Sequence, residues 1–116
     1  MTGQEAFQEL GFSYEELVAR FSGNEMLAER FLKKFVEDKT YSALCQAIEE
    51  NDYAGIESFA HTLKGVSANL GLQSIFRYAE AVVKAVRQKQ YSEILTLFEL
   101  LKQSYEQVIF LLKQLD

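Results

Sequence analysis

Proline is absent from this chain of 116 residues, where average usage would give about six prolines. The six glycines form almost none of the Gly/Pro dipeptides that mark tight turns. Both observations argue against an all-β fold, which needs many such turns. The single cysteine, Cys45, excludes an internal disulfide and is typical of a protein from a reducing cytoplasm.

Long apolar runs are also missing. No stretch approaches the ~20 apolar residues of a membrane span, and no basic and then apolar segment at the amino terminus predicts secretion. The formal net charge of -5 argues against nucleic acid as a partner, because nucleic acids attract basic surfaces. We therefore expect a cytoplasmic protein without nucleic-acid or membrane partners. Its length predicts one domain, 1–116, with a core that needs no metal or disulfide.

Apolar residues recur at helical spacing along most of the chain. Two capping-box patterns, Thr2-x-x-Glu5 and Ser13-x-x-Glu16, predict short helices within residues 1–23. Four longer helices are expected over about 25–50, 53–70, 72–88 and 91–114. Short connections between long amphipathic helices are typical of an antiparallel up-down-up-down four-helix bundle. The prediction is thus an all-α fold, with a bundle over about 24–115 and one or two short extra N-terminal helices.

The last predicted helix carries a strict 3.5-residue apolar repeat, the seam needed for packing at shallow angles. A coiled-coil dimer could use the same seam, which would make the chain a helical dimerisation protein. A monomeric bundle is favoured because three other helices also need apolar surface. The seam consists of Ile94, Phe98, Leu101, Tyr105, Val108, Leu112 and Leu115.

The helix predicted over 53–70 holds the only histidine, His61. At 100° per residue, its apolar side chains fall within an arc of about 120°, and His61 lies about 170° from the middle of that arc. The imidazole should therefore point to solvent. The arc contains Ile56, Phe59, Ala60, Leu63, Val66, Ser67 and Leu70.

Gly65 follows His61 by one turn, on the same exposed side. A glycine within a helix costs about 1 kcal/mol relative to alanine, and close approach of another molecule is the simplest compensating gain. This region therefore predicts a site at which a partner docks. The exposed neighbours expected to take part are Glu57, Ser58, Lys64, Gly65 and Ala68.

The pattern His61-x-Leu63-Lys64-Gly65-x-Ser67-x-x-Leu70-Gly71 resembles the signature of histidine-containing phosphotransfer (HPt) domains. These are helical bundles of about this length that act in multistep two-component signalling. The resemblance implies that His61 takes a phosphoryl group from a receiver-domain aspartate, or from a hybrid histidine kinase, and passes it to another receiver. The remote ring nitrogen of His61 would be the phosphorylated atom.

The motif residues around His61 have chemically suitable types. Neutral imidazole carries a ring-nitrogen lone pair and can attack phosphorus without a neighbouring base. Lys64, one turn on, can place its ammonium beside the phosphoryl oxygens. Gly65 would leave room for the receiver. Ser67 falls on the inner face, where we expect its hydroxyl to bond a backbone carbonyl one turn earlier.

One position departs from the family pattern. Many members carry a glutamine or glutamate on the next helix that bonds the other ring nitrogen of the histidine. Counting along the motif places Val83 there, with Lys84 beside it and Glu80 one turn before. Valine cannot accept a hydrogen bond, so Glu80 or water is left to orient the imidazole.

Other kinds of site have no support in the sequence. No second histidine and no Glu-x-x-His pair is present, so we expect no metal site. Gly-rich phosphate loops are missing, so we expect no nucleotide cofactor. The chain is expected to be a carrier and not an enzyme, with Mg²⁺ needed only in the partner receiver. The remaining alternative is a module that docks receivers without being phosphorylated, which an intact set of His61, Lys64 and Gly65 disfavours.

Overall fold

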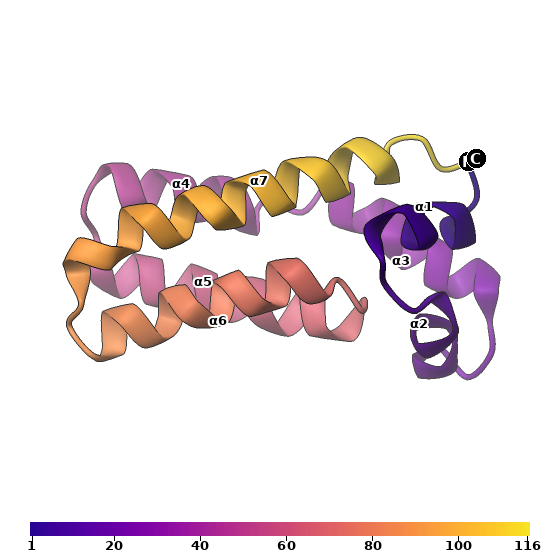
Figure 1. The fold of residues 1–116 in the computed structure, drawn as a ribbon, viewed down its shortest axis with the longest axis horizontal. Coiled ribbons are helices and arrows are strands. Elements are labelled where there is room, and N and C mark those ends of the chain that lie inside the picture. Colours follow the sequence, from indigo (N-terminus) through magenta and orange to yellow (C-terminus); the bar gives the residue numbers. More distant parts are fainter.

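The computed structural model describes all 116 residues, which form α-helices, one short 3-10 helix and no β-strand (Figure 1). The all-α prediction is therefore confirmed. The elements are α1 (Gly3–Leu10), α2 (Tyr14–Arg20), α3 (Glu25–Val36), α4 (Thr40–Glu49), α5 (Tyr53–Asn69), α6 (Gln73–Arg87), η1 (Tyr91–Glu93) and α7 (Ile94–Leu112).

Helices α4 to α7 form an antiparallel bundle along the long axis of the molecule, which measures 40 × 23 × 21 Å (Figure 1). Successive helices pack against each other. An aromatic stack closes the bundle between α4 and α7, with the Tyr41 and Tyr105 ring centroids 3.8 Å apart. Burial raises the pKa of Tyr105 to about 12. Helices α1 to α3 gather at one end.

The prediction of a single long helix over 25–50 is wrong, because residues 37–39 separate α3 from α4. The carboxylate of Asp38 accepts a hydrogen bond from the backbone N–H of Thr40 at 2.7 Å. Aspartate commonly competes in this way with helical hydrogen bonding. Both halves nevertheless lie against α7, since Phe35 of α3 and Tyr41 of α4 each contact Tyr105.

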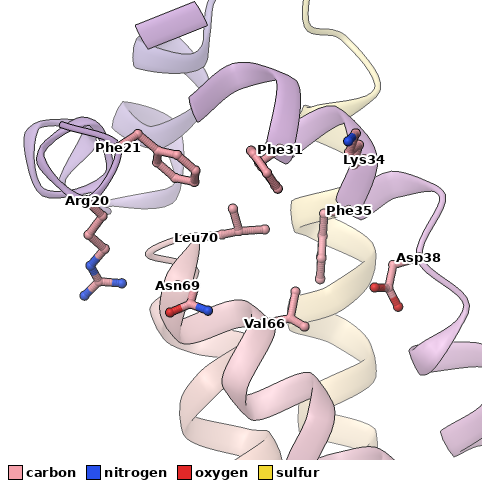
Figure 2. A pocket seen from close by; sticks show the side chains of 9 residues that line it. All are labelled: Arg20, Phe21, Phe31, Lys34, Phe35, Asp38, Val66, Asn69 and Leu70. Atoms are coloured by element: carbon pink, nitrogen blue, oxygen red, sulfur yellow. The ribbon is translucent and has the colours of Figure 1, made fainter. Parts of the chain in front are cut away.

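Phe31 of α3 lies at the edge of the core, where its side chain is 39% exposed. Its ring lies 5.2 Å from that of Phe21, at the edge of a half-open cavity of about 770 Å³. The cavity lies between α2, α3 and the end of α5 (Figure 2), and its lining residues are Arg20, Phe21, Phe31, Lys34, Phe35, Asp38, Val66, Asn69 and Leu70.

The predicted buried faces of the later helices are confirmed. One face of α6 is buried in the core, and the predicted α7 seam is used within the bundle. Four of the seam residues are fully buried, and the other three are partly buried against the core. No helix is both long enough and apolar enough to cross a membrane. The buried α6 residues are Ile75, Ala79, Val82, Val83, Ala85 and Val86.

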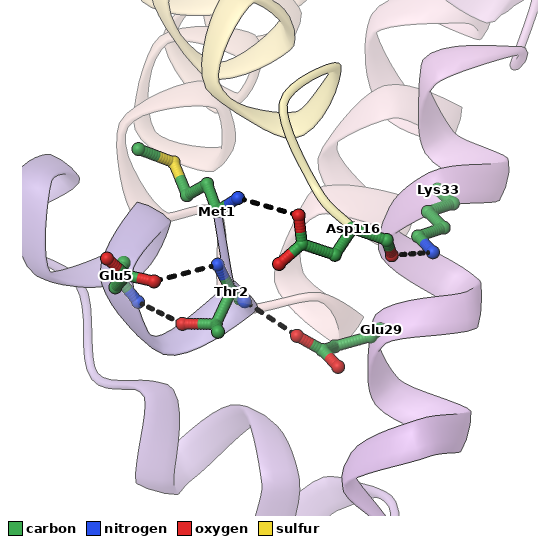
Figure 3. A network of polar contacts seen from close by, with 7 residues as sticks. Met1, Thr2, Glu5, Glu29, Lys33 and Asp116 are labelled. Atoms are coloured by element: carbon green, nitrogen blue, oxygen red, sulfur yellow. Dashed lines mark hydrogen bonds and ion pairs between the residues drawn. The ribbon is translucent and has the colours of Figure 1, made fainter.

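Polar contacts tie the first helix to α3 and to the end of the chain (Figure 3). The Glu29 carboxylate accepts the backbone N–H of Gly3 at 2.6 Å. The amino group of Met1 lies 3.0 Å from the carboxylate of Asp116, whose backbone oxygen accepts from Lys33. The capping box of Thr2 and Glu5 is present in full, so polar contacts hold α1 at its N-terminal end.

Gly71 ends the α5 segment with a φ of 68°, in the left-handed region that favours glycine. We expect Gly71→Ala to lower the free energy of unfolding by about 1–2 kcal/mol. The cause is backbone strain, because an added Cβ would meet Phe7 only at an ordinary 3.5 Å. Urea denaturation measures the effect, with Gly65→Ala as the matched control. Because Gly65 lies within a helix, Gly65→Ala should raise the free energy of unfolding by up to about 1 kcal/mol. Equal stability of Gly71→Ala and the wild type would contradict this account of the turn.

Candidate functional site

Helix α5 presents His61 to solvent, as the periodicity predicts. The opposite face of α5 is buried in the core through Ile56, Ala60, Leu63 and Ser67. The side chain of Asp52 caps the start of the helix by accepting from the N–H of Gly55 at 3.0 Å. The direction of the imidazole is therefore set by the core that the rest of α5 joins.

The surface beside His61 is open. A Cβ added at Gly65 would meet no atom within 4 Å. Ser58 is exposed like His61, whereas Glu57 and Ala68 are half-buried. The structure thus brings the four expected docking residues onto one side of α5, with bare backbone near the centre of the strip.

Ser67 is the one polar residue that is fully buried. Its hydroxyl donates to the backbone carbonyl of Leu63 at 2.8 Å and lies 3.1 Å from that of Lys64. The expected bond to a carbonyl one turn earlier is confirmed. Because its polar group is satisfied inside its own helix, Ser67 can remain within the core without a partner from another helix.

Lys64 does not extend freely into solvent. Its Nζ lies 3.4 Å from a carboxylate oxygen of Glu80 on α6 and 5.9 Å from the centre of the Phe76 ring. The other oxygen of Glu80 lies 3.7 Å from Nζ of Lys84, one turn further along α6. One carboxylate therefore holds two ammonium groups next to the turn that carries His61.

A second ion pair joins the same two helices. The Glu57 carboxylate on α5 lies 3.4 Å from Nε of Arg87 on α6. Sequence reasoning identified Glu57 but missed Arg87, because the pairing depends on the register between α5 and α6. That register could be found only by aligning the exposed edges of both helices in antiparallel order.

The position of the missing family acceptor is occupied by a core residue. Val83 is buried and has no polar side-chain atom. Glu80, the alternative, directs both carboxylate oxygens at lysines. The structure shows no hydrogen bond from the imidazole to either side chain.

Two hollows border the exposed strip of α5 in addition to the larger cavity. One, of about 450 Å³, lies on the α4 side and includes Ser58 and Thr62. The other, of about 240 Å³, lies on the α2 and α6 side and includes Ala68 and Phe76. One hollow therefore adjoins the strip at Ser58 and the other at Ala68, and His61 lines neither. No group of three or more His, Cys, Asp or Glu side chains is placed to hold a metal ion.

Comparison with protein-family models finds a match to the Hpt domain over residues 27–109. Neither the comparison with curated proteins nor that with solved structures gives a match. The matched segment begins in α3, ends in α7 and contains His61 and both cross-helix ion pairs. All the candidate site residues therefore lie within the matched part of the chain.

Proposed function

Because this chain belongs to the Hpt domain family, the histidine phosphotransfer carriers of phosphorelays, we propose that His61 is the residue that carries the phosphoryl group. The observation that carries the proposal is that the only histidine of the chain is exposed on α5 within the matched segment. No other side chain of the open strip offers a comparable nitrogen nucleophile.

The proposed reaction is a direct exchange between nitrogen and oxygen. The remote ring nitrogen of neutral His61 attacks phosphorus of a receiver's aspartyl phosphate. A nitrogen–phosphorus bond forms while the bond from the aspartyl oxygen to phosphorus breaks. The departing oxygen keeps the electron pair as a carboxylate, and the ring retains its proton on the other nitrogen. Charge is conserved, and the reverse reaction delivers the group to the next receiver.

The partner surface in this proposal is the strip around Gly65, with Glu57, Ser58 and Ala68 beside it. Family membership implies receiver domains as partners, and a hybrid kinase is the other possible donor. The receiver would bring the Mg²⁺ and the acidic cluster, so catalysis of transfer belongs to the partner and this chain acts as carrier. We propose a monomer, since the α7 seam is consumed inside the bundle. The proposed location is the cytoplasm, which suits the free thiol of Cys45.

The identity of the acceptor is tested by His61→Gln. This variant should fold, because the side chain is exposed, but should take no label from a phosphorylated receiver. The modification of the wild type should be labile in acid and stable in alkali, as expected for phosphate linked to nitrogen. Radiolabel transfer and gel mobility measure both properties. Continued labelling of His61→Gln would disprove the assignment.

Lys64 is expected to stabilise the transferred group. Lys64→Ala should slow transfer by about tenfold, less than the loss at a buried oxyanion donor, because water partly replaces the ammonium. Its free energy of unfolding should change by less than about 1 kcal/mol, because the Lys64 and Glu80 side chains are about 29% and 33% exposed. Rapid-quench kinetics measure the transfer rate, and urea denaturation of the same preparation measures the stability. A transfer rate equal to that of the wild type would show that Lys64 has no role in the proposed chemistry.

Gly65 is expected to serve docking and not folding. Gly65→Gln should fold, since space around the position is open, but should weaken receiver binding and transfer together by at least about tenfold. Gly65→Ala is the matched control for the loss of backbone freedom, and it should affect binding far less. Calorimetry with a receiver and thermal melts measure the two properties. Normal transfer by Gly65→Gln would overturn the proposed docking role, and unfolding would assign Gly65 to the bundle instead.

A further inference from the structure

Glu80 is the only carboxylate that pairs with two cations in this structure. Its two oxygens lie 3.4 Å from Nζ of Lys64 and 3.7 Å from Nζ of Lys84. Glu80 and Lys64 are both about one-third exposed, whereas Lys84 is 67% exposed. The three side chains together carry one net positive charge on the seam between α5 and α6.

The register of the two helices places this cluster at His61. Glu57 pairs with Arg87, and Lys64 pairs with Glu80, so the two helices run antiparallel with matching steps. His61 lies between Glu57 and Lys64 on α5. The stretch of α6 between Arg87 and Glu80 that faces it contains Val83 and Lys84. Lys64 thus lies one turn from His61 along its own helix, and Lys84 lies on the stretch of α6 that faces His61.

We propose that Glu80 is a positioning residue that holds Lys64 and Lys84 beside an unmodified His61 and releases both ammonium groups once His61 is phosphorylated. This proposal rests on the proposed function of His61. The phosphoryl group brings two negative charges and three acceptor oxygens to the seam, whereas the Glu80 carboxylate offers one charge and two oxygens. The lysines therefore exchange Glu80 for the phosphoryl group. Little free energy is lost when they leave Glu80, because exposed ion pairs contribute little to stability.

The retained Glu80 carboxylate then opposes the phosphorylated state. It competes for the two lysines and repels the new dianion across the seam. The Glu80 carboxylate therefore destabilises phosphorylated His61 and favours transfer to a receiver. The two lysines stabilise phosphorylated His61 and favour transfer from a receiver. Glu80 thereby sets the equilibrium between phosphorylated carrier and phosphorylated receiver.

The test measures that equilibrium for variants of the full chain mixed with one phosphorylated receiver. Glu80→Gln keeps the shape of the side chain and removes its charge. It should raise the equilibrium ratio of phosphorylated carrier to phosphorylated receiver about threefold at low salt. Lys84→Gln should lower the ratio by a similar factor. Glu99→Gln, an exposed carboxylate on α7, removes the same charge elsewhere and is the matched control. Both effects should shrink at high salt, because screening weakens exposed charges.

The outcomes distinguish the role proposed for Glu80 from the carrier function proposed for His61. A ratio for Glu80→Gln equal to that of Glu99→Gln, or lower than wild type, overturns the role of Glu80 while labelled His61 still supports the carrier function. A wild-type chain that takes no label on His61, from the receiver or from phosphoramidate, overturns both. Thermal melts identify any misfolded variant, and in that case an unchanged ratio for Lys84→Gln overturns the proposal by itself.

Discussion

Burial of one face of α5 is the constraint on which the rest of the site depends. Ile56, Ala60 and Leu63 are almost inaccessible to solvent, and each large apolar side chain contributes about 1.5–3 kcal/mol when buried. Turning the helix to hide His61 would expose all of them. The core therefore determines the direction of the imidazole, and no hydrogen bond to its ring is required for that purpose. Position on the helix and packing of the opposite face are sufficient.

The exposed face, by contrast, is shaped by features that give little stability. Gly65 lacks the side chain that would favour the helix, and the pairs of Glu80 with Lys64 and Lys84 lie where water weakens them. Such contacts rearrange at little free-energy cost, which is compatible with the role proposed for this surface in accepting a phosphoryl group and a partner in turn. Under that proposal, one side of α5 is packed for folding and the other serves transfer.

The sequence predicted α5, α6 and α7 well because each keeps one apolar period over its whole length. The same reasoning failed at residues 37–39, although a signal was present. In one continuous helix Phe35 and Leu44 would lie about 180° apart, so the break restores both to the core. The part of the candidate site that lies on one helix was predictable from the sequence, and it includes His61, Lys64 and Gly65. The ion pairs of Glu80 and Arg87 were not, because they arise from the register between two helices.

The most direct measurement is phosphorus NMR of the chain after incubation with a phosphorylated receiver, with the single histidine labelled with nitrogen-15. The account predicts one new phosphorus resonance, coupled to the remote ring nitrogen of His61 and lost on acidification. A phosphorus resonance without coupling to imidazole, or phosphate found on a hydroxyl or carboxyl group, would contradict it.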